Sequence, residues 1–353
     1  DGQQHVNLSF AWDGTTLDFR HDGSPFRLQE VAALLSGGSS KEFESDETTG
    51  RFGTGFMVTH ALACCIDITI AIHAEGQYEV AEIGLDRQGD EEAILANIRA
   101  SHEAMKAAVP RESLEGLPTA SLRYRVDRPE AVAEGVESLR RTLPYLFATC
   151  PKFGDVSIQT WNAASMVKES MPHLVVRNRL VTVANRDNRS PESMRVFSFA
   201  ASDASKASLI VVVNGEGTTK VRLPAVGFPR LFARFPVRDT GSLPIPLVLN
   251  APFALSQERD KVHMEDADKI ADAMSALSKV TQYATDAGWQ DAHRLCQLDH
   301  IATADAPSHN QADWWNGILS KAAKSLSVLP LVRTKRGLAP AVIEKDSDAE
   351  YHV

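Results

Sequence analysis

The first 35 residues alternate between hydrophobic and polar positions in a way that predicts two strands and a helix. Residues 5–12 (HVNLSFAW) and 16–21 (TLDFRH) both alternate with a period of two, and the intervening DGT is typical of a tight turn. Residues 27–35 (RLQEVAALL) have helical spacing, with Ser24 as the expected N-cap and Pro25 as the first helical residue. The pattern therefore predicts a β-hairpin followed by a helix.

The next stretch of the chain continues this mixture of helices and strands. The apolar residues at 56–65 (FMVTHALACC) predict a buried helix, and residues 90–109 have amphipathic spacing with acidic residues in the first turn. The other predicted elements are strands at 66–74, 78–86 and 119–126 and a helix at 129–149.

The second half of the chain changes character. Residues 155–253 hold a series of β-type segments separated by turn residues, and the chain is mainly helical from residue 265 onward. We therefore expect three domains, at 1–126, 127–262 and 263–353. The fold class is α/β (α+β), with a mixed, mostly antiparallel β domain with helices after the first domain and a helical C-terminal segment.

Composition and charge exclude several classes of protein. The 353 residues carry a net charge of −9, which argues against a nucleic-acid-binding surface, because contacts with phosphates need clustered Lys and Arg. The four cysteines form no C-x-x-C motif, and the sequence contains no bilayer-length apolar stretch and no signal peptide. We expect a reduced, cytoplasmic protein that does not enter a membrane.

Three glycines interrupt the chain immediately before the predicted buried helix. Gly50, Gly53 and Gly55 follow a polar segment at 36–49 that cannot form a core. Glycines at a helix N-terminus let backbone N–H groups approach phosphate oxygens, because no Cβ intervenes. A Rossmann fingerprint would follow a strand directly and a P-loop would contain GK[ST], so neither motif is present. The alternative is a plain flexible loop.

Two segments together resemble the GHKL ATPase superfamily. They are residues 21–26 (HDGSPF) and 34–56 (LLSGGSSKEFESDETTGRFGTGF), and the likeness is greatest to the sacsin-type, heat-shock-chaperone-like branch. It covers residues 1–126, and residues 235–260 resemble the segment that follows the nucleotide domain in that branch. The resemblance implies a Bergerat-type α/β sandwich that binds ATP with Mg²⁺.

The resemblance assigns the triphosphate end of the site to the glycine-rich segment. The lid would span residues 36–49, and backbone amides near Gly53 would hold the β- and γ-phosphates. The residues that the resemblance assigns to nucleotide binding here are Ser39, Ser40, Lys41, Gly50, Arg51, Phe52, Gly53, Thr54, Gly55 and Phe56.

The resemblance also assigns the end of the site that binds the base. Gly23 matches the glycine of the family's D-x-G motif, which places His21 at the position of the adenine-reading aspartate and Asp22 one residue later. Either Asp22 reads the adenine amino group after a local shift, or base recognition is weaker or altered. Thr119 would be the threonine that supports the adenine pocket. The alternatives are that Asp22 only forms a turn and that Thr119 is an ordinary strand residue.

The family's E-x-x-x-N-x-x-D helix is not found in this sequence. Asp1 and Gly2 resemble its end, so the resemblance places the general-base glutamate and the Mg²⁺-binding asparagine upstream of Asp1. We therefore expect the chain as given to bind nucleotide poorly and not to hydrolyse it, because phosphoryl transfer needs both groups. Arg259 is a candidate γ-phosphate sensor, and its alternative is a surface ion pair with Glu258 or Asp260.

These observations predict the ATP-binding head of a larger protein. Lid closure on Mg-ATP would drive conformational change, self-association or movement of further domains of the same polypeptide, with slow hydrolysis, in a chaperone-like or bacterial antiviral defence role. The alternative is a nucleotide-sensing or structural interaction module that keeps the fold without turnover. A histidine kinase would need a phospho-acceptor helix, and the sequence supplies none.

Overall fold

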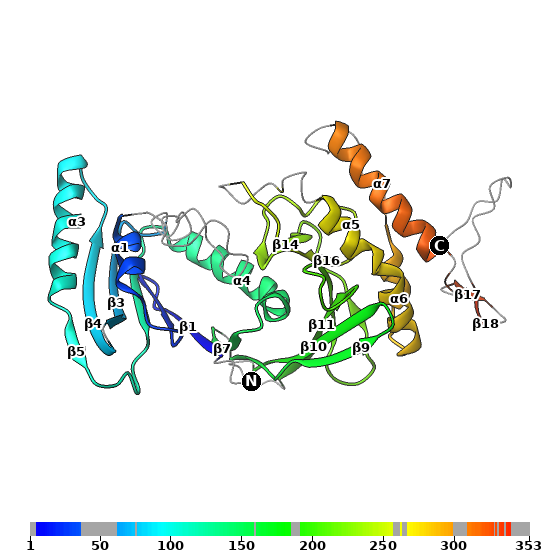
Figure 1. Ribbon diagram of the computed structural model, residues 1–353, viewed down its shortest axis with the longest axis horizontal. Helices are drawn as coiled ribbons and strands as arrows, with labels where there is room; N and C mark the ends of the chain where they lie inside the picture. The colour runs from blue at the N-terminus through cyan, green and yellow to red at the C-terminus, as the bar shows by residue number, and fades with distance from the viewer. Residues whose placement is uncertain are drawn as a thin grey trace. The chain divides into compact units, whose positions relative to one another are not determined.

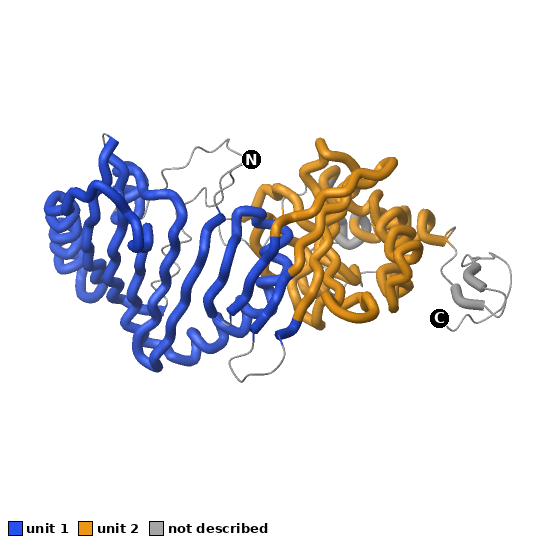
Figure 2. The backbone as a smooth tube through the Cα atoms, turned by 90° about the horizontal axis from the view of Figure 1, so that it is seen from below, with its two compact units in different colours: residues 1–164, 181–192 blue, residues 165–180, 193–353 orange. Residues whose placement is uncertain are grey.

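The computed structural model forms two compact units. It describes residues 5–36, 62–74, 76–158, 160–184, 191–256, 262, 267–298, 309–327, 329, 332–334 and 337–339. Unit 1 comprises Asp1–Ala164 and Val181–Glu192, and unit 2 comprises Ser165–Leu180 and Ser193–Val353 (Figure 2). The boundaries of the three domains expected from the sequence, at 126 and 262, stay a prediction.

Unit 1 is built on a mixed, mostly antiparallel sheet. Its strands pair in the order β8-β7-β1-β2-β6-β3-β4-β5, and β7 runs parallel to β1 while the other pairs are antiparallel. The strands are β1 (Val6–Trp12), β2 (Thr16–His21), β3 (Cys65–Ala74), β4 (Gln77–Asp86), β5 (Val109–Arg111), β6 (Ala120–Arg125), β7 (Phe153–Ser157) and β8 (Trp161–Ala163).

Helices α1 (Leu28–Ser36), α3 (Glu91–Lys106) and α4 (Pro129–Thr149) contribute to one core with this sheet (Figure 1). Alternate residues of β3 enter the core, so that Ile68 lies opposite Ile83 of β4 and Leu122 of β6. Val31 of α1 is fully buried against them. The inner face of the sheet is therefore hydrophobic and covered by helices, as expected for an α/β sandwich.

The alternate positions on the same strands form a charged outer face. Asp18 of β2 pairs with Arg123 of β6 at 2.9 Å, and Asp67 of β3 pairs with Arg125 at 3.1 Å. These side chains are partly or largely exposed, so the pairs contribute little to stability. The outer face of the sheet is therefore in contact with solvent, and a site that needs buried side chains is expected on the inner face.

The start of α1 differs from the prediction. Ser24 and Pro25 lie before the helix, because Phe26 forms a bridge to β3 instead: its N–H donates to the Ala71 carbonyl at 2.9 Å. The helix begins at Leu28, and the Glu30 carboxylate accepts a 2.7 Å hydrogen bond from the Arg27 N–H. A tertiary backbone pairing thus prevails over the local N-cap signal.

The predicted buried helix at 56–65 is contradicted at its C-terminal end. Residues 56–61 lie outside the described residues, but Cys65 is the first residue of β3 and Ala63 and Cys64 are not helical. Cys65 pairs with Asp86 at the end of the β3–β4 ladder. The end of the apolar run belongs to a strand. Its sequence alone does not reveal this, because an uninterrupted run of apolar residues is compatible with either a buried strand or a buried helix.

Unit 2 is a mostly antiparallel β structure with helices, as the sequence predicts. The strand order is β15-β14-β16-β12-β11-β10, and β14 is parallel to β16. In addition, β9 pairs with β10 and β13 pairs with β12. The strands are β9 (Val167–Met171), β10 (Leu174–Val183, whose last three residues belong to unit 1), β11 (Glu192–Ala200), β12 (Ser208–Asn214), β13 (Val221–Arg222), β14 (Leu231–Ala233), β15 (Phe235–Pro236) and β16 (Val248–Asn250).

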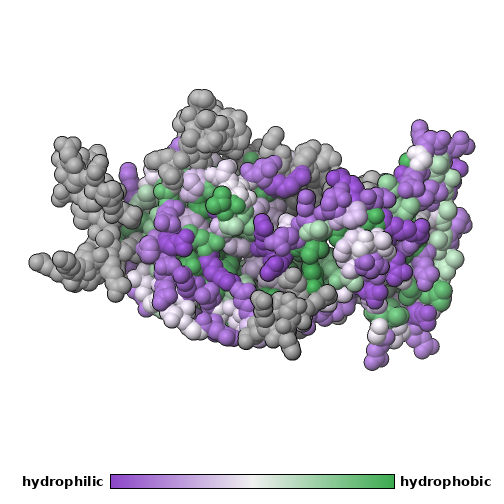
Figure 3. Space-filling view, turned by 180° about the vertical axis from the view of Figure 1, so that it is seen from behind, coloured by the Kyte–Doolittle hydropathy of each residue, from purple (hydrophilic) through white to green (hydrophobic). Residues whose placement is uncertain are grey.

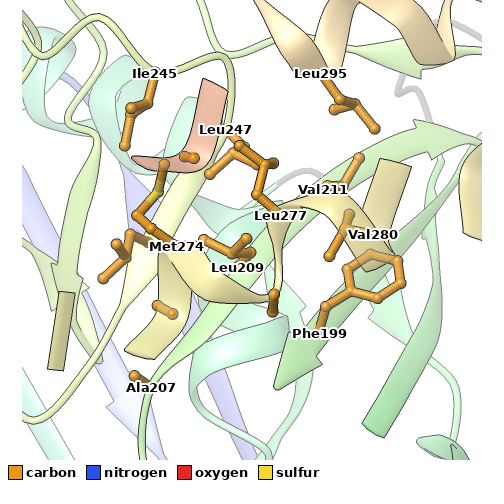
Figure 4. Close-up of a cluster of buried hydrophobic side chains, with 14 of the residues drawn as sticks. Phe199, Ala207, Leu209, Val211, Ile245, Leu247, Met274, Leu277, Val280 and Leu295 are labelled. Carbon is orange, nitrogen blue, oxygen red and sulfur yellow. The ribbon is translucent and has the colours of Figure 1, made fainter. Parts of the chain in front are cut away.

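The helices of unit 2 follow its strands in the sequence. They are α5 (Ala267–Ser275), α6 (Leu277–Asp286), the 3-10 helix η3 (Ala292–Cys296) and α7 (His309–Leu326), and a hairpin of β17 (Val332–Thr334) and β18 (Gly337–Ala339) comes after them. Leu209 and Val211 of β12 lie against Leu277 and Val280 of α6 in a hydrocarbon core (Figure 4). The predicted α/β fold class with a helical C-terminal segment is confirmed.

The surface of the described residues is mixed in polarity. On the face drawn in Figure 3, hydrophilic residues are interspersed with smaller hydrophobic areas. Among the helices in the described ranges, none combines the length and the apolar character needed to cross a membrane.

Candidate functional site

The candidate base-binding residues lie where β2 ends and the HDG turn (residues 21–23) begins. On β2, Leu17 and Phe19 belong to the inner, helix-covered face, while Asp18 belongs to the charged outer face. His21 follows Phe19 by two residues and is paired with Leu8 of β1, so it lies on the inner face. The alternation of the strand therefore places His21 on the side of the sheet that carries the helices.

A hydrogen bond joins two of the residues that the sequence analysis assigns to the base. The Thr119 hydroxyl donates to the Gly23 carbonyl at 2.7 Å, across 96 positions of sequence. Thr119 is only 5% exposed, and its own carbonyl accepts from the Ala71 N–H at 2.8 Å. The HDG turn is thus attached to the start of β6, and the structure brings His21, Gly23 and Thr119 together.

The His21 imidazole is held in one tautomer. Its Nδ1 accepts a hydrogen bond from the Gly23 N–H at 3.2 Å, so the proton of the neutral ring resides on Nε2. Its ring contacts those of Phe19 and Phe26, with centroid distances of 6.0 and 6.2 Å. Burial lowers the pKa of His21, and the nearby Asp22 charge opposes that effect only in part. His21 therefore presents a neutral N–H donor near pH 7.

The backbone at position 23 is closely packed. A Cβ there would lie 3.3 Å from His21 Nδ1 and 3.4 Å from the Val6 side chain. A side chain at position 23 would therefore require small shifts of His21 or Val6.

Asp22 is bound on the other side of the strand pair. Its Oδ1 accepts from the Asn7 N–H at 2.7 Å and its Oδ2 accepts from Asn7 Nδ2 at 2.6 Å. Asn7 precedes Leu8, the partner of His21, so Asn7 and Asp22 alternate with the two inner-face residues. Both carboxylate oxygens of Asp22 therefore serve to join the HDG turn to β1.

A β-bulge orients Asn7. The β1–β7 register shifts between Val6 and Leu8, and Asn7 Oδ1 accepts from the Asp155 N–H at 2.8 Å. A Cβ on Gly154 would lie 2.5 Å from that same oxygen. Sequence reasoning missed Asn7, because a polar residue in an alternating strand looks solvent-facing and its partner lies 148 positions away.

The rest of the predicted site falls outside the described residues. This applies to Ser39, Ser40, Lys41, Gly50, Arg51, Phe52, Gly53, Thr54, Gly55, Phe56 and Arg259. In the part of the chain that the structure describes, no three His, Cys, Asp or Glu side chains gather closely enough to hold a metal ion. The described half of the predicted site is thus its base end.

Comparison with known proteins gives distant structural neighbours. No family model matches the chain, and no curated protein matches it. The ATPase region of Saccharomyces cerevisiae topoisomerase II bound to ICRF-187 (dexrazoxane) is similar with 11% identity and a TM-score of 0.28 over 50% of this chain and 52% of that one. A second structure of the same region has 12% identity and a TM-score of 0.28, with the same coverage of both chains.

A third neighbour comprises the ATPase and transducer domains of DNA topoisomerase II from Balamuthia mandrillaris. It has 13% identity and a TM-score of 0.30, over 50% of each chain. This chain therefore spans about half the length of the structures that it matches. Because these TM-scores are low, the case for a nucleotide site rests on the geometry of the HDG turn.

Proposed function

We propose that this chain contains the nucleotide-binding head of a GHKL-type protein, of the sacsin-type, heat-shock-chaperone-like branch. The observation that carries the proposal is the 2.7 Å hydrogen bond from Thr119 to the Gly23 carbonyl. It joins two residues that the sequence resemblance assigns, independently of each other, to one end of a nucleotide. The helix-covered α/β sandwich around them is the arrangement that the resemblance implies.

In this proposal the HDG turn binds the base and the glycine-rich segment binds the triphosphate. Thr119 fixes the turn, the Gly23 N–H binds His21 Nδ1, and His21 presents its Nε2–H beside two aromatic rings. ATP is the nucleotide that the resemblance implies, and closure of the lid at 36–49 would couple binding to movement or self-association of the following domains. A chaperone-like role or a role in bacterial defence belongs to the same proposal.

The proposal includes magnesium only because the sequence resemblance implies it. The described residues offer no cluster of metal ligands, and the resemblance places the metal-binding asparagine upstream of Asp1. When bound, Mg²⁺ would neutralise charge on the phosphates. Slow hydrolysis by the intact protein belongs to the proposal and depends on those upstream residues.

A second candidate function is a nucleotide sensor or interaction module without turnover. The observation that favours it is the pair of hydrogen bonds that ties both Asp22 oxygens to Asn7. An aspartate held in this way stabilises the turn and is not directed at the base. The two candidates differ in phosphate release, since only the ATPase releases phosphate in the presence of magnesium.

Substitution of Thr119 tests the proposal. Thr119→Val removes the hydroxyl that holds Gly23, and we expect it to weaken nucleoside triphosphate binding at least about fivefold, which corresponds to roughly 1 kcal/mol. Thr119→Ser keeps the hydroxyl, so its affinity for the nucleotide should stay within about twofold of that of the original protein, because the hydrogen bond to Gly23 is retained.

The measurement is titration calorimetry with ATP and GTP, together with phosphate release. It uses the 353-residue chain and the protein extended by the upstream residues that the resemblance implies. Circular dichroism of both variants identifies loss of folding. If no triphosphate binds either protein, or if Thr119→Val binds as well as Thr119→Ser, the proposed site is wrong.

A further inference from the structure

We propose that the free edge of β9 in unit 2 is an interface at which a second copy of this chain adds its own β9 as an antiparallel strand. The two chains are related by a twofold axis that passes beside Glu169. The inference concerns unit 2 alone and does not depend on the nucleotide site of unit 1. It rests on the pairing, the exposure and the symmetry of the five residues Val167–Met171.

The outer side of β9 is a regular strand edge. In the part of the chain that the structure describes, β9 pairs with β10 alone (Figure 1). All five of its residues are exposed. Its register with β10 is continuous from Val167↔Asn178 to Met171↔Leu174, without a bulge. A strand of this kind presents a row of backbone N–H and C=O groups to which another strand can be added.

The turn after β9 shows which backbone groups point outward. Residues 172–173 form a two-residue turn between Met171 and Leu174. A hydrogen bond between the first and fourth residues closes such a turn, so Met171 and Leu174 are a hydrogen-bonded pair. Hydrogen-bonded and non-hydrogen-bonded pairs alternate along an antiparallel ladder. The backbone groups of Lys168 and Ser170 therefore face away from β10 and form the free edge.

The charged side chains of β9 are bound within the chain and do not guard this edge. Natural edge strands are often protected by a lysine or another charge. Here the Lys168 ammonium lies 2.7 Å from a carboxylate oxygen of Asp203, which also binds the Arg177 guanidinium at 2.9 Å. On the opposite face of β9, burial raises the pKa of the Tyr283 hydroxyl, and the neighbouring Glu169 carboxylate raises it further. Both charges of β9 are thus directed at its own unit.

The sequence of β9 is self-complementary in one antiparallel register. A twofold axis normal to the sheet keeps each face of the strand on its own side, so paired residues must differ by an even number of positions. Pairing Lys168 with the partner's Ser170 meets this condition and joins outward-facing groups of both chains, each pair exchanging both of its N–H···O bonds. In this register Val167 lies opposite the partner's Met171, and Glu169 lies opposite its own equivalent.

This register also covers the exposed apolar side chains of β9. Val167 is 52% exposed and Met171 is 45% exposed, and both lie on the face of β9 that carries Glu169. They form non-hydrogen-bonded pairs with the second copy, in which side chains lie close together, so each valine packs against a methionine. A second copy thus supplies the backbone groups and both apolar partners. The contact is small, which predicts a reversible dimer.

The first test measures association of the 353-residue chain by sedimentation velocity, in the absence of nucleotide. We expect a monomer–dimer equilibrium that depends on concentration. Met171→Glu places a charge at both apolar pairs and should weaken dimerisation at least about tenfold. The matched control is Val226→Glu, at a fully exposed apolar position elsewhere in unit 2, which should leave the equilibrium unchanged.

Two further variants act on the edge and on the axis. Ser170→Pro removes an outward-facing N–H without removing a hydrogen bond to β10, and it should weaken dimerisation at least about tenfold because the symmetry repeats the loss. Glu169→Gln removes the pair of like charges at the axis and should strengthen dimerisation about two- to fivefold. Circular dichroism of each variant identifies loss of folding.

Cysteine cross-linking tests the register. Residue 169 faces its own equivalent in a non-hydrogen-bonded pair, where the Cα atoms are about 4.5 Å apart and a disulfide can form. Glu169→Cys should therefore give a covalent dimer when dissolved oxygen and a copper catalyst are present. Lys168→Cys is the matched control, because its thiol faces the partner's Ser170 and should stay unlinked. The original chain, whose described cysteines are free, supplies the background.

Each outcome bears on the proposed interface. A chain that stays monomeric at every concentration, whether or not it captures an extended peptide, overturns the proposal. A dimer that Met171→Glu and Ser170→Pro leave unchanged does so as well. Equal cross-linking of Lys168→Cys and Glu169→Cys, or a weaker dimer for Glu169→Gln, contradicts the twofold register. If Ser170→Pro does not fold, the cross-linking comparison still decides the question.

Discussion

The core of unit 2 and the inner face of β1 and β2 in unit 1 use aromatic residues in opposite ways. In unit 2, Phe199 and Leu209 are fully buried in a core of aliphatic and aromatic side chains (Figure 4). The Phe199 ring contacts Phe197, Tyr283 and Trp289 there. In unit 1, Phe10, Phe19 and Phe26 are only partly buried, Phe10 contacts Phe19, and Phe19 and Phe26 each contact the ring of His21. One cluster is complete as a hydrophobic core, and the other leaves part of its apolar surface and one N–H donor unused.

The contrast suggests that the unit 2 core serves the stability of the protein and that the HDG turn serves ligand recognition. A hydrocarbon core contributes free energy in proportion to the area that it buries, without regard to any ligand. The HDG turn instead uses its polar groups to fix geometry: Thr119 holds Gly23, Gly23 holds His21, and Asn7 holds Asp22. We therefore expect changes in the unit 2 core to alter stability alone and changes at the turn to alter binding.

The largest expected effect on stability comes from the unit 2 core. Phe199→Ala removes a fully buried ring and should lower the free energy of unfolding by about 3–5 kcal/mol. The matched change in unit 1, Phe19→Ala, should cost less, because Phe19 is only partly buried. Urea denaturation followed by fluorescence measures both. A larger loss for Phe19→Ala would contradict the contrast between the two clusters.

A smaller effect is expected where β7 meets the turn. Gly154→Ala places a methyl group 2.5 Å from Asn7 Oδ1, and the resulting overpacking should cost about 1–3 kcal/mol while disturbing the Asn7–Asp22 pair. Gly135 lies on the exposed face of α4 with open space around it. Gly135→Ala should therefore stabilise by about 0.5–1 kcal/mol. Thermal denaturation of the two variants measures both changes, and equal effects would show that Asn7 tolerates a methyl group at position 154.

The smallest effect is a pH dependence that originates at His21. Burial holds the pKa of His21 below its unfolded value of 6.5, so between the two pKa values the unfolded chain binds a proton that the folded chain does not. The free energy of unfolding should therefore be constant above about pH 6.5 and decrease as the pH falls toward the folded pKa. Subtracting the profile of His21→Gln isolates this contribution. A difference that grows in the opposite direction would mean that the folded site favours the imidazolium.

Local patterns predict much of this fold, and contacts distant in sequence account for the failures. The acidic first turn of α3, with Asp90 capping the Ala93 N–H, is predictable from the sequence, and so are the alternating strands β1 and β2. The start of α1 is not, because the pairing of Phe26 with β3 overrides Ser24 and Pro25. The helix predicted up to Cys65 is wrong at that residue, because its apolar neighbourhood has no period that distinguishes strand from helix.

The base end of the site is predictable only in part, for the same reason. His21, Gly23 and Thr119 come from a motif and from its expected partner, and the structure brings them together. Asn7 has no motif, since its role depends on a parallel pairing with β7 and on a bulge of β7 at Gly154 and Asp155, opposite Asn7. The tautomer of His21 depends on one backbone hydrogen bond. Both are properties of three-dimensional packing that spacing in a sequence does not encode.

The most direct test of the proposed base site is a crystal structure of the protein with a bound purine nucleoside triphosphate. We predict that the base lies on the inner face of β2, within reach of His21 Nε2 and with its ring beside the Gly23–Thr119 contact. A nucleotide bound elsewhere on the protein, or a turn covered by protein so that no base can reach His21, would contradict it.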